Sequence, residues 1–341
     1  MRQIGIHSGS SNIDHSRRPA GYDLTSVEVA LFATGEGEPI IRSTILGSGI
    51  RRLTVVTSPE MLRSAICETE FDMIVLEASE QVEGICDQIS DIRQGLLGEN
   101  PYVVINVASW LSSNDAIRTF INAGTDDITV MPTSVDAVVA RLDHIIETRK
   151  KFVATLKYLG PDRRAPDRAK NSELCAFKVP NNVRYKATGY ISTRVYMQKI
   201  RRTDRIAKEH RLRRTALQFH EIVSAMEGFV KENPDGSVSK KQLSEMMDLV
   251  HHIAENLATD PSSEIPELVS SLQNVMKEVV ESSRVDGQLC ALLRVHAEAL
   301  LALLRGERDS GELVVRAIFT ASKIIEARAE MNHNSTNHTV Q

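Results

Sequence analysis

The stretch FDMIVLEASE, residues 71–80, decides how the first half of this chain is interpreted. Its centre, Met73–Leu76, is an uninterrupted apolar run between Asp72 and Glu77. Short continuous apolar runs are typical of strands that are buried on both faces of a parallel sheet. This run ends on a carboxylate, Glu77, and the sequence therefore raises the question of what a glutamate does at the tip of a buried strand.

Similar apolar runs recur on both sides of this stretch, separated by amphipathic segments. The predicted strands are 27–33, 53–57, 72–77, 102–108 and 127–130. The predicted helices between them are 38–47, 59–68, 80–94, 112–123 and 134–149. Such alternation is typical of an α/β doubly wound parallel sheet, whose ligands lie at the carboxyl ends of the strands. Residues 24–150 are predicted to form this domain.

From residue 191 onward the apolar spacing becomes helical. One stripe recurs at gaps of three and four residues, on Leu212, Ala216, Phe219, Val223, Met226 and Val230. A second stripe lies on Leu243, Met246, Val250, Ile253 and Leu257, and further helices are predicted over 264–283, 287–305 and 311–330. Residues 191–330 are therefore predicted to form an all-α bundle of four or five helices, which could form a homodimer. Residues 151–190 contain prolines and glycines without a clean period, which predicts a basic linker extended over other surfaces.

The composition is that of a globular protein, with 341 residues, 42% hydrophobic and 25% charged. No apolar run approaches the roughly 18 residues that a membrane helix needs. The amino terminus has no hydrophobic signal-peptide core, so we expect a cytoplasmic protein with disordered tails at 1–23 and 331–341. The four cysteines form no CxxC pair, which argues against a zinc site and a disulfide scaffold.

Four segments resemble the receiver domain of bacterial two-component response regulators, the CheY-like domain. AIRTFINAGTDDITVMP (116–132) is similar to the family's helix-glycine-Asp-Asp-strand-Lys-Pro passage, and FDMIVLEAS to the strand that carries the phospho-accepting aspartate. LTVVTSPEMLRSAI (53–66) resembles the second strand and helix, and NPYVVINVASW (100–110) the fourth strand. The resemblance implies a flavodoxin-like fold with strand order 2-1-3-4-5. YLGPDRR (158–164) resembles a segment that often follows the receiver in alphaproteobacterial regulators with helical C-terminal halves.

The resemblance also implies where phosphotransfer chemistry would lie. In the family, an acid pair and the acceptor aspartate hold magnesium, a lysine pairs with the phosphoryl group, and a hydroxyl follows it. The equivalent positions here are Ala33 and Thr34 for the acid pair, Glu77 for the acceptor, Ala108 or Ser109 for the hydroxyl, and Met131 with Pro132 for the lysine-proline pair. These replacements predict a degenerate receiver, or pseudo-receiver, with no cofactor and no magnesium.

Three interpretations of Glu77 stay open. It could be a fixed negative charge in place of a phosphorylated aspartate, a solvated residue left by drift, or a residual phosphorylation site. Its side chain is about one methylene longer than that of aspartate, which spoils the in-line geometry of transfer. Glu36 and Glu38 are an alternative source of oxygen ligands, whereas Asp72 lies at the wrong end of its strand.

The net charge of −4 conceals a basic middle. Residues 149–214 hold 20 Lys and Arg against 5 Asp and Glu, or +15, and the remainder holds 21 against 40, or −19. Nine of these basic residues lie in 194–214, namely Arg194, Lys199, Arg201, Arg202, Arg205, Lys208, Arg211, Arg213 and Arg214. The aromatic residues that precede or interleave with them are Tyr158, Phe177, Tyr185, Tyr190 and Tyr196. This pattern suits nucleic acid, by phosphate neutralisation and base stacking. Intramolecular or protein contacts are the competing interpretation.

Other motifs are weaker. TGEGEP (34–39) lacks the third glycine of a dinucleotide loop, because residue 40 is isoleucine, and is interpreted as a permissive loop. KENPDGSVSKKQLSEMM (231–247) resembles a calcium-binding loop, but lysine and glutamine stand at its first and last ligand positions. It predicts instead a turn followed by a Ser239–Gln242 capping box.

Predicted helices carry His220, His251, His252 and His296. His296 falls on an apolar face, which predicts a buried, hydrogen-bonded core histidine, while His251 or His252 would be a phosphate carrier only if exposed on a bundle. No Ser-His-Asp, HExxH or Walker pattern occurs, so no enzymatic activity is predicted.

The leading hypothesis is a signal-transduction adaptor of the phosphorelay type. Its receiver would contact a histidine kinase or another regulator through residues 108–121 and 127–132. The alternative is a nucleic-acid-binding regulator that uses the 194–214 helix.

Overall fold

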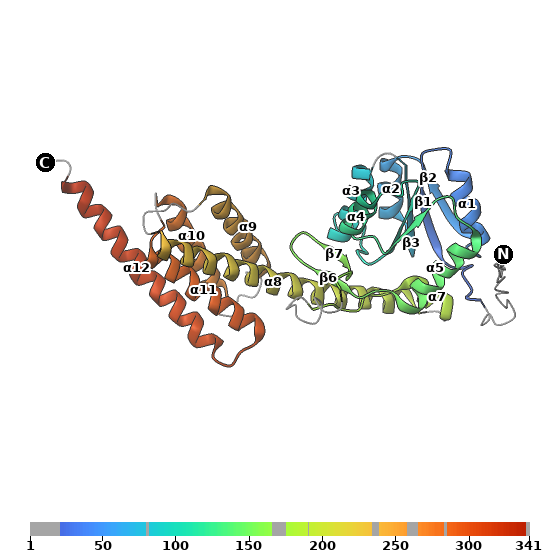
Figure 1. Ribbon diagram of the computed structural model, residues 1–341. Coiled ribbons are helices and arrows are strands. Elements are labelled where there is room, and N and C mark those ends of the chain that lie inside the picture. The colour runs from blue at the N-terminus through green and yellow to red at the C-terminus, as the bar shows by residue number, and fades with distance from the viewer. Residues whose placement is uncertain are drawn as a thin grey trace, which may run out of the picture.

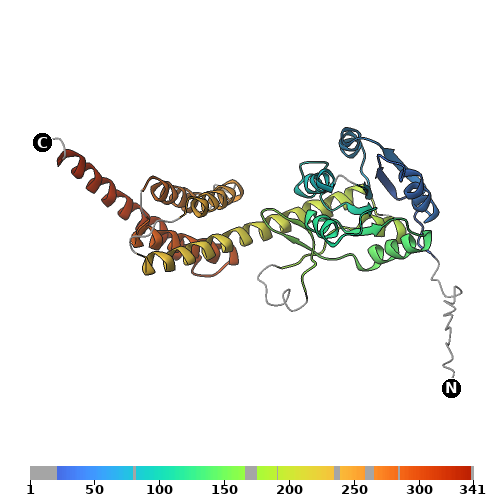
Figure 2. The same ribbon diagram turned by 45° about the horizontal axis from the view of Figure 1, so that its top comes forward.

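The computed structural model describes residues 21–79, 82–165, 175–189, 191–233, 239–257, 265–282 and 285–338, and of 331–338 the backbone alone. Two lobes are joined by one long helix, α8 (Figure 1). The turned view shows the same helix running from one lobe into the other (Figure 2).

The amino-terminal lobe is built on a five-stranded parallel sheet of order β2-β1-β3-β4-β5. Its strands are β1 (Glu28–Phe32), β2 (Arg52–Val56), β3 (Met73–Ala78), β4 (Val104–Ser109) and β5 (Asp127–Val130). This order confirms the predicted flavodoxin-like receiver fold. All six residues of β3 are buried, as the apolar run predicted.

Helices cover both faces of the sheet (Figure 1). They are α1 (Glu38–Gly47), α2 (Pro59–Glu68), α3 (Val82–Gln94), α4 (Asn114–Ala123) and α5 (Val135–Thr148). Apolar side chains of α1 and α5 form one core with the sheet, and those of α2, α3 and α4 form the other. Ser58, Ser113 and Ser134 cap α2, α4 and α5 by accepting hydrogen bonds from backbone N–H groups of the first turn.

The segment after the receiver differs from the extended linker that was predicted over 151–190. It forms the antiparallel pair β6 (Phe152–Ala154) and β7 (Leu159–Pro161), and then helix α7 (Asn182–Thr188). Its apolar side chains share a core with the receiver and with α8. They are too few and too irregularly spaced for the sequence to show a periodic pattern. The buried members of this core are Tyr102, Phe152, Ala154, Leu159, Phe177, Tyr196, Ile200 and Ala207.

A buried ionic network fastens this segment to the receiver. Asp126, just before β5, lies 2.8 Å from Arg93 of α3 and 2.8 Å from Arg149. The ring of Phe152 lies against both guanidinium groups, 5.2 and 5.1 Å from the ring centroid. The segment that directly follows α5 is therefore part of the amino-terminal lobe.

The long helix α8 (Thr193–Glu232) belongs to both lobes. Its first half packs on the core that contains Phe152, while its second half buries the apolar stripe predicted from Leu212 to Val230. It shares that second core with α9 (Lys240–Leu257), α10 (Ile265–Glu281), α11 (Gly287–Arg305) and α12 (Ser310–His338). The predicted helical region is confirmed, but no loop separates it from the amino-terminal lobe, because the single helix α8 contributes to the cores of both lobes.

The ends of the chain differ partly from the predicted tails. Residues 1–20 and 339–341 lie outside the described part. Tyr22 is placed by a hydrogen bond of 3.2 Å from its hydroxyl to Glu147 Oε1. Helix α12 continues to His338, past the predicted end at 330, because no proline or glycine follows Gly311 to break it.

Helix α11 is long and apolar enough to cross a membrane by length and composition alone. This differs from the expectation that no segment reaches that length. The helix contributes ten buried residues and lies in the core of the helical region, which accounts for its apolar composition.

His296 of α11 is fully buried, which confirms the predicted core histidine. Its Nδ1 lies 2.7 Å from the carbonyl oxygen of Leu292, and its Nε2 lies 2.9 Å from Ser271 Oγ. Burial lowers the pKa of His296, and the backbone hydrogen bond opposes this only in part. The neutral ring is therefore the form that the folded helical region holds.

His296 predicts a pH dependence of stability. Because its folded-state pKa lies below the ordinary value of about 6.5, its contribution is present above that pH and is lost as the pH falls through the folded-state pKa. Urea unfolding from pH 7.5 to 5 is expected to show falling stability, with a smaller slope in His296→Gln. The exposed His251, which pairs with Glu255, gives the control His251→Gln. Equal slopes in all three proteins would contradict the prediction.

Candidate functional site

Glu77 lies at the carboxyl end of β3 and is only 7% exposed. Its Oε2 accepts hydrogen bonds from the backbone N–H groups of Thr34 and Gly35, at 3.1 and 3.4 Å. Its Oε1 accepts a hydrogen bond of 3.0 Å from the indole Nε1 of Trp110. The interpretation of Glu77 as a solvated residue is therefore wrong, because both oxygens are held by N–H donors inside the lobe.

Trp110 reaches Glu77 because of strand register. Glu77 pairs with Ala108 across β3 and β4, and Trp110 follows the end of β4, where its N–H donates to the carbonyl of Ala78 at 2.9 Å. Trp110 lies at the end of the predicted fourth-strand segment, NPYVVINVASW, and no role was predicted for it. It is the single tryptophan of the chain, a signal that marked it for attention.

The loop between β1 and α1 closes over the same place. A β-carbon built at Gly37 would overlap Glu77 Oε1 and would lie 2.7 Å from ring atoms of Trp110. Gly37 therefore allows the loop to lie directly on the carboxylate and the indole. Gly37 of TGEGEP thus has a packing role that the interpretation as a permissive loop did not foresee. We call Glu77, Trp110 and residues 34–37 the sealed site.

The other positions of the predicted phosphotransfer site bring no acidic or basic side chain to Glu77. Ala33 is buried, and Thr34 contributes its backbone N–H. The hydroxyl of Ser109 turns to the following residues, where it donates to the carbonyl of Leu111 at 2.9 Å. Met131 lies in the core between the sheet, α1 and α5, before a cis peptide bond to Pro132.

The loop carboxylates do not complete a cation cage. Glu38 lies 3.8 Å from Arg42 in an ion pair along α1, and Glu36 is exposed. Within the described ranges, no group of three or more His, Cys, Asp and Glu side chains is arranged to hold a metal ion.

Asp72 lies at the opposite, amino end of β3, as predicted. It accepts a hydrogen bond of 2.7 Å from the N–H of Glu28, forms an ion pair of 2.6 Å with Lys186, and is hydrogen-bonded by Asn182. Burial raises the pKa of Asp72, and the bond from Lys186 opposes this only in part. Asp72 therefore anchors α7 to the receiver and takes no part in the sealed site.

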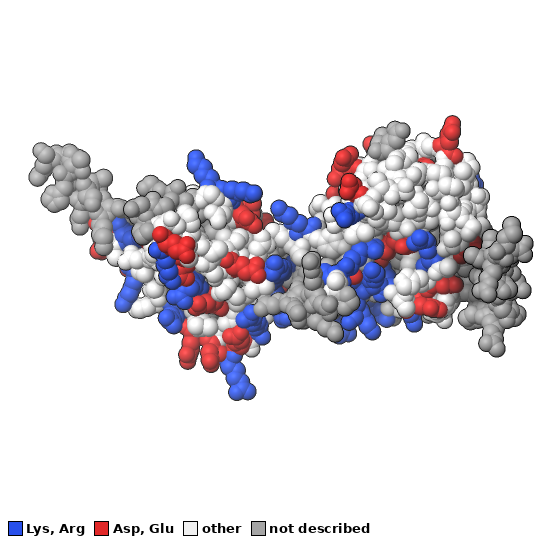
Figure 3. Space-filling model, viewed as in Figure 1, with Lys and Arg blue, Asp and Glu red and all other residues white. Residues whose placement is uncertain are grey.

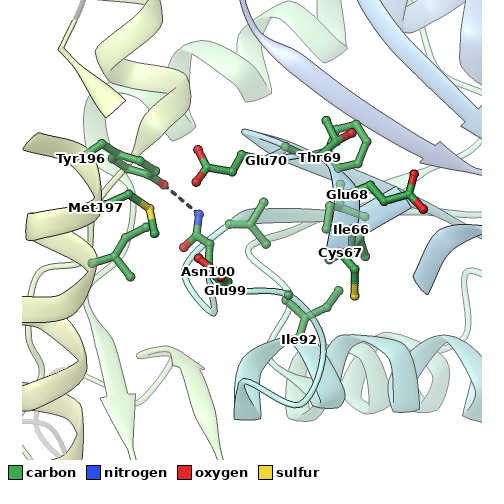
Figure 4. Close-up of a pocket in the computed structure, with 15 residues that line it drawn as sticks. Ile66, Cys67, Glu68, Thr69, Glu70, Ile92, Glu99, Asn100, Tyr196 and Met197 are labelled. Atoms are coloured by element: carbon green, nitrogen blue, oxygen red, sulfur yellow. Dashed lines mark hydrogen bonds between the residues drawn. The ribbon is translucent and has the colours of Figure 1, made fainter. Parts of the chain in front are cut away.

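A cavity of about 230 Å³ also lies at the amino ends of the strands, between the receiver and α8. Figure 4 shows Tyr196 and Met197 of α8 on one side and the loop residues Glu70 and Asn100 on the other. The amide of Asn100 donates a hydrogen bond of 2.8 Å to the Tyr196 hydroxyl. This cavity is a gap in the contact between α8 and the receiver, remote from Glu77.

The nine predicted basic residues fall into two groups. Arg211 is half-buried and donates to Gln94 at 3.0 Å, Arg214 pairs with Glu221 at 3.6 Å, and Lys199 contacts Tyr185. The remaining six are exposed, namely Arg194, Arg201, Arg202, Arg205, Lys208 and Arg213. Lys and Arg side chains gather along the lower middle of the molecule in Figure 3.

The aromatic residues that were predicted to stack on bases point elsewhere. Phe177 and Tyr196 are buried in the core with Phe152, and Tyr185 packs edge-on against Tyr196. The hydroxyl of Tyr158 donates to the carbonyl of Pro161 at 3.1 Å. Tyr190 lies outside the described residues. The stacking part of the nucleic-acid hypothesis is therefore not supported by these side chains.

The weaker motifs resolve differently. The Ser239–Gln242 capping box is confirmed, since Gln242 N donates to Ser239 Oγ at 3.2 Å and Ser239 N to Gln242 Oε1 at 3.4 Å. In the calcium-like loop, Lys231 pairs with Glu227 at 3.0 Å, while residues 234–238 lie outside the described part. His252 is half-buried, and burial lowers its pKa.

No family model matches the chain, and no curated protein matches it. Among solved structures, it is similar to an orphan response regulator of H. pylori, with 19% identity over 35% of this chain and 95% of that chain, at a TM-score of 0.30. A response regulator from Thermotoga maritima is 16% identical, and the match covers 36% of this chain and 99% of that chain at a TM-score of 0.30. A putative CpaE2 pilus assembly protein from Sinorhizobium meliloti is 15% identical, and the match covers 34% of this chain and 98% of that chain at a TM-score of 0.29. The fold assignment itself rests on the strand order.

Proposed function

We propose that this protein is a cytoplasmic signal-transduction regulator of the two-component type whose receiver lobe acts through protein contacts, without phosphotransfer. The observation that carries the proposal is the sealed site. Both oxygens of Glu77 accept N–H hydrogen bonds, and Trp110 occupies the position beside them. The receiver scaffold is kept while the place of its chemistry is filled.

The physical argument concerns access. In-line transfer needs a carboxylate oxygen that a phosphorus atom can approach, and magnesium needs several oxygen ligands with free lone pairs. The groups that contact the carboxylate are the indole N–H of Trp110 and the backbone N–H groups of Thr34 and Gly35. These N–H groups are donors, so they match a carboxylate and cannot serve as ligands of a cation. A phosphate donor would have to displace the indole and the loop together.

The sealed site also changes what the fixed charge of Glu77 would do. Its carboxylate is compensated internally and holds the β1–α1 loop to the end of β4. Glu77 then acts as a lock on one arrangement of these loops, in place of a charge presented to a partner. We propose that this arrangement is the one that partners recognise.

We propose residues 108–121 and 127–132 as the contact surface for a histidine kinase or another regulator. Val130, at the end of β5, is 41% exposed, and Val135 at the start of α5 is also exposed. Asp127 and Arg141 form an ion pair of 2.8 Å beside them. Exposed apolar side chains beside charged ones support a protein contact.

Trp110 allows a direct test, because it is the single tryptophan and touches Glu77. Adding magnesium with acetyl phosphate or beryllofluoride is expected to leave its fluorescence unchanged, and mass spectrometry is expected to find no phosphorylated Glu77. Glu77→Gln is the control that shows whether the indole emission responds to this site. A magnesium-dependent change in emission, or phosphate on Glu77, would defeat the proposal.

The contact surface is tested separately. A native-lysate pull-down is expected to retain the same partners with acetyl phosphate and with a chelator, and to lose them with Val130→Glu. A partner set that changes with phosphate donor would mean that phosphotransfer persists.

Glu77→Gln is itself expected to destabilise the protein by about 1–2 kcal/mol. The amide retains one acceptor and turns an N–H₂ group toward N–H donors, so one hydrogen bond is lost and a buried donor is left without a partner. Urea unfolding measures the loss, and Glu36→Gln on the exposed loop is the matched control, expected within about 0.5 kcal/mol of wild type. Equal effects of the two substitutions would show that Glu77 is not held as described.

A further inference from the structure

Six exposed basic residues of α8 define a surface, which we call the basic face: Arg194, Arg201, Arg202, Arg205, Lys208 and Arg213. Four of them, at 194, 201, 205 and 208, are separated by seven, four and three residues, which places them in one stripe of a helix. Fourteen residues of helix span about 21 Å. The opposite side of the same turns is buried through Tyr196, Ile200 and Ala207. Because the opposite side of α8 is buried in a core, the side chains of the basic face point to solvent.

The basic face carries charge that its own lobe does not neutralise. Among the described residues, none of its six side chains forms an ion pair, whereas Arg211 and Arg214 of the same helix are engaged internally. Residues 194–214 contain two acidic side chains, and one of them, Asp204, is half-buried. Burial raises the pKa of Asp204, and the hydrogen bond with Tyr102 and the charges of Lys208 and Arg211 oppose this only in part. The surplus of charge faces solvent.

The chemistry of the face selects its partner. Five of the six residues are arginines, whose planar guanidinium groups form paired hydrogen bonds with phosphate oxygens. A membrane surface would need several large apolar side chains beside the charges, and from 194 to 213 the described structure exposes one, Val195, at 41%. Binding of single strands would need aromatic platforms, and Phe177 and Tyr196 are buried behind the helix.

We propose that the basic face of α8 binds the phosphate backbone of double-stranded nucleic acid without reading its sequence. A rigid helix that offers charge along one side fits a regular row of phosphates, which recur about every 3.4 Å along each strand. The back of the helix is fixed to the receiver, so base edges are out of reach of its buried side chains. This inference does not depend on the sealed site, because no residue of the basic face touches it.

The test is fluorescence anisotropy of the full chain with two labelled 20-base-pair DNA duplexes of unrelated sequence, over a salt series. Binding is expected for both duplexes, with affinities within about twofold of each other and a log–log salt slope no steeper than about −5 for six contacts. The triple variant Arg201→Gln, Arg205→Gln, Lys208→Gln is expected to flatten the slope by about 3 and to weaken binding at least tenfold at low salt.

The matched control removes the same charge elsewhere. Arg316, Lys240 and Lys241 are exposed on α12 and α9, outside the proposed contact surface, and their replacement by glutamine is expected to leave the slope unchanged. Circular dichroism checks that both variants keep the helices. No binding at 50 mM salt, equal weakening in the control variant, or tighter binding of a polyglutamate peptide than of either duplex would overturn the proposal. The last result would assign the face to an acidic protein.

Discussion

Replacing Asp126 by alanine is expected to lower the free energy of unfolding by about 3–5 kcal/mol, because it leaves two buried cations without a counter-charge. Arg93 is 1% exposed and Arg149 is 6% exposed at the side chain, and both contact Asp126 at 2.8 Å. Asp126 Oδ2 also accepts a hydrogen bond of 2.9 Å from the N–H of Ile105. Urea unfolding followed by circular dichroism measures the loss.

The same residue predicts an acid dependence. Burial alone would raise the pKa of Asp126, but Arg149 and Arg93 together outweigh it and the pKa is lowered. A carboxyl group with a lowered folded-state pKa stabilises the fold above its unfolded pKa of about 3.9, and this stability is lost as the pH falls through the folded-state pKa. The wild type should therefore lose stability below about pH 4 more steeply than Asp126→Asn.

The neighbouring Asp127 supplies the control for Asp126. It forms an ion pair of 2.8 Å with Arg141 at the surface. Asp127→Ala is expected to cost about 1 kcal/mol or less, because exposed pairs contribute little. Similar losses at positions 126 and 127 would show that the arginines find other partners and that the network is not a core feature.

Substituting Gly124 by alanine is expected to cost about 2–5 kcal/mol, from two sources. Gly124 ends α4 with φ of 104°, a left-handed conformation that a side chain disfavours. A β-carbon there would also lie 2.8 Å from the carbonyl oxygen of Leu159 in β7 and 3.2 Å from Arg93 Cγ. The clash is with backbone, which cannot rotate away. Thermal and urea unfolding of Gly124→Ala measure the effect.

Gly228 provides a contrasting control within the same chain. It lies inside α8, and a β-carbon there meets no other atom within 4 Å. Gly228→Ala is therefore expected to stabilise the helix by roughly 0.5–1 kcal/mol. If Gly124→Ala were as harmless as Gly228→Ala, the close contact between α4 and β7 would be wrong.

Asp126→Ala and Gly124→Ala both test whether the segment after α5 belongs to the amino-terminal lobe. The pair β6–β7, the Arg93–Asp126–Arg149 network and Phe152 make the segment after α5 part of the receiver lobe. The first half of α8 packs on the same core, so the basic face is presented from a rigid back. A receiver domain that ended at residue 150 would lack Phe152, a buried residue of the core shared with α8.

The sequence located the five strands and their helices closely, because alternating apolar runs are local properties. Strand β5 matches its predicted bounds, whereas β4 begins two residues later and ends one residue later than predicted. The apolar stripe from Leu212 to Val230 was also visible, because a helix repeats on itself. The segment 149–161 was missed, because its few apolar residues acquire meaning only against Arg93 and Asp126, far away in the chain.

The candidate site around Glu77 was also predicted only in part from the sequence. From the sequence, Glu77 could be placed at a strand end and its missing acidic and basic partners could be recognised. Neither the burial of Glu77 nor the part played by Trp110 and Gly37 could be read there, since the indole reaches the carboxylate through the register of β3 and β4.

The amino-acid sequence by itself determined most of the secondary structure, the order of the two halves and which residues stand at the positions that resemble a phosphotransfer site. Only the tertiary structure decided that Glu77 is enclosed by an indole and a glycine-containing loop, and which arginines of α8 face outward. The reason is physical: periodicity is set by neighbours along the chain, whereas burial and hydrogen bonding are set by residues that folding brings together.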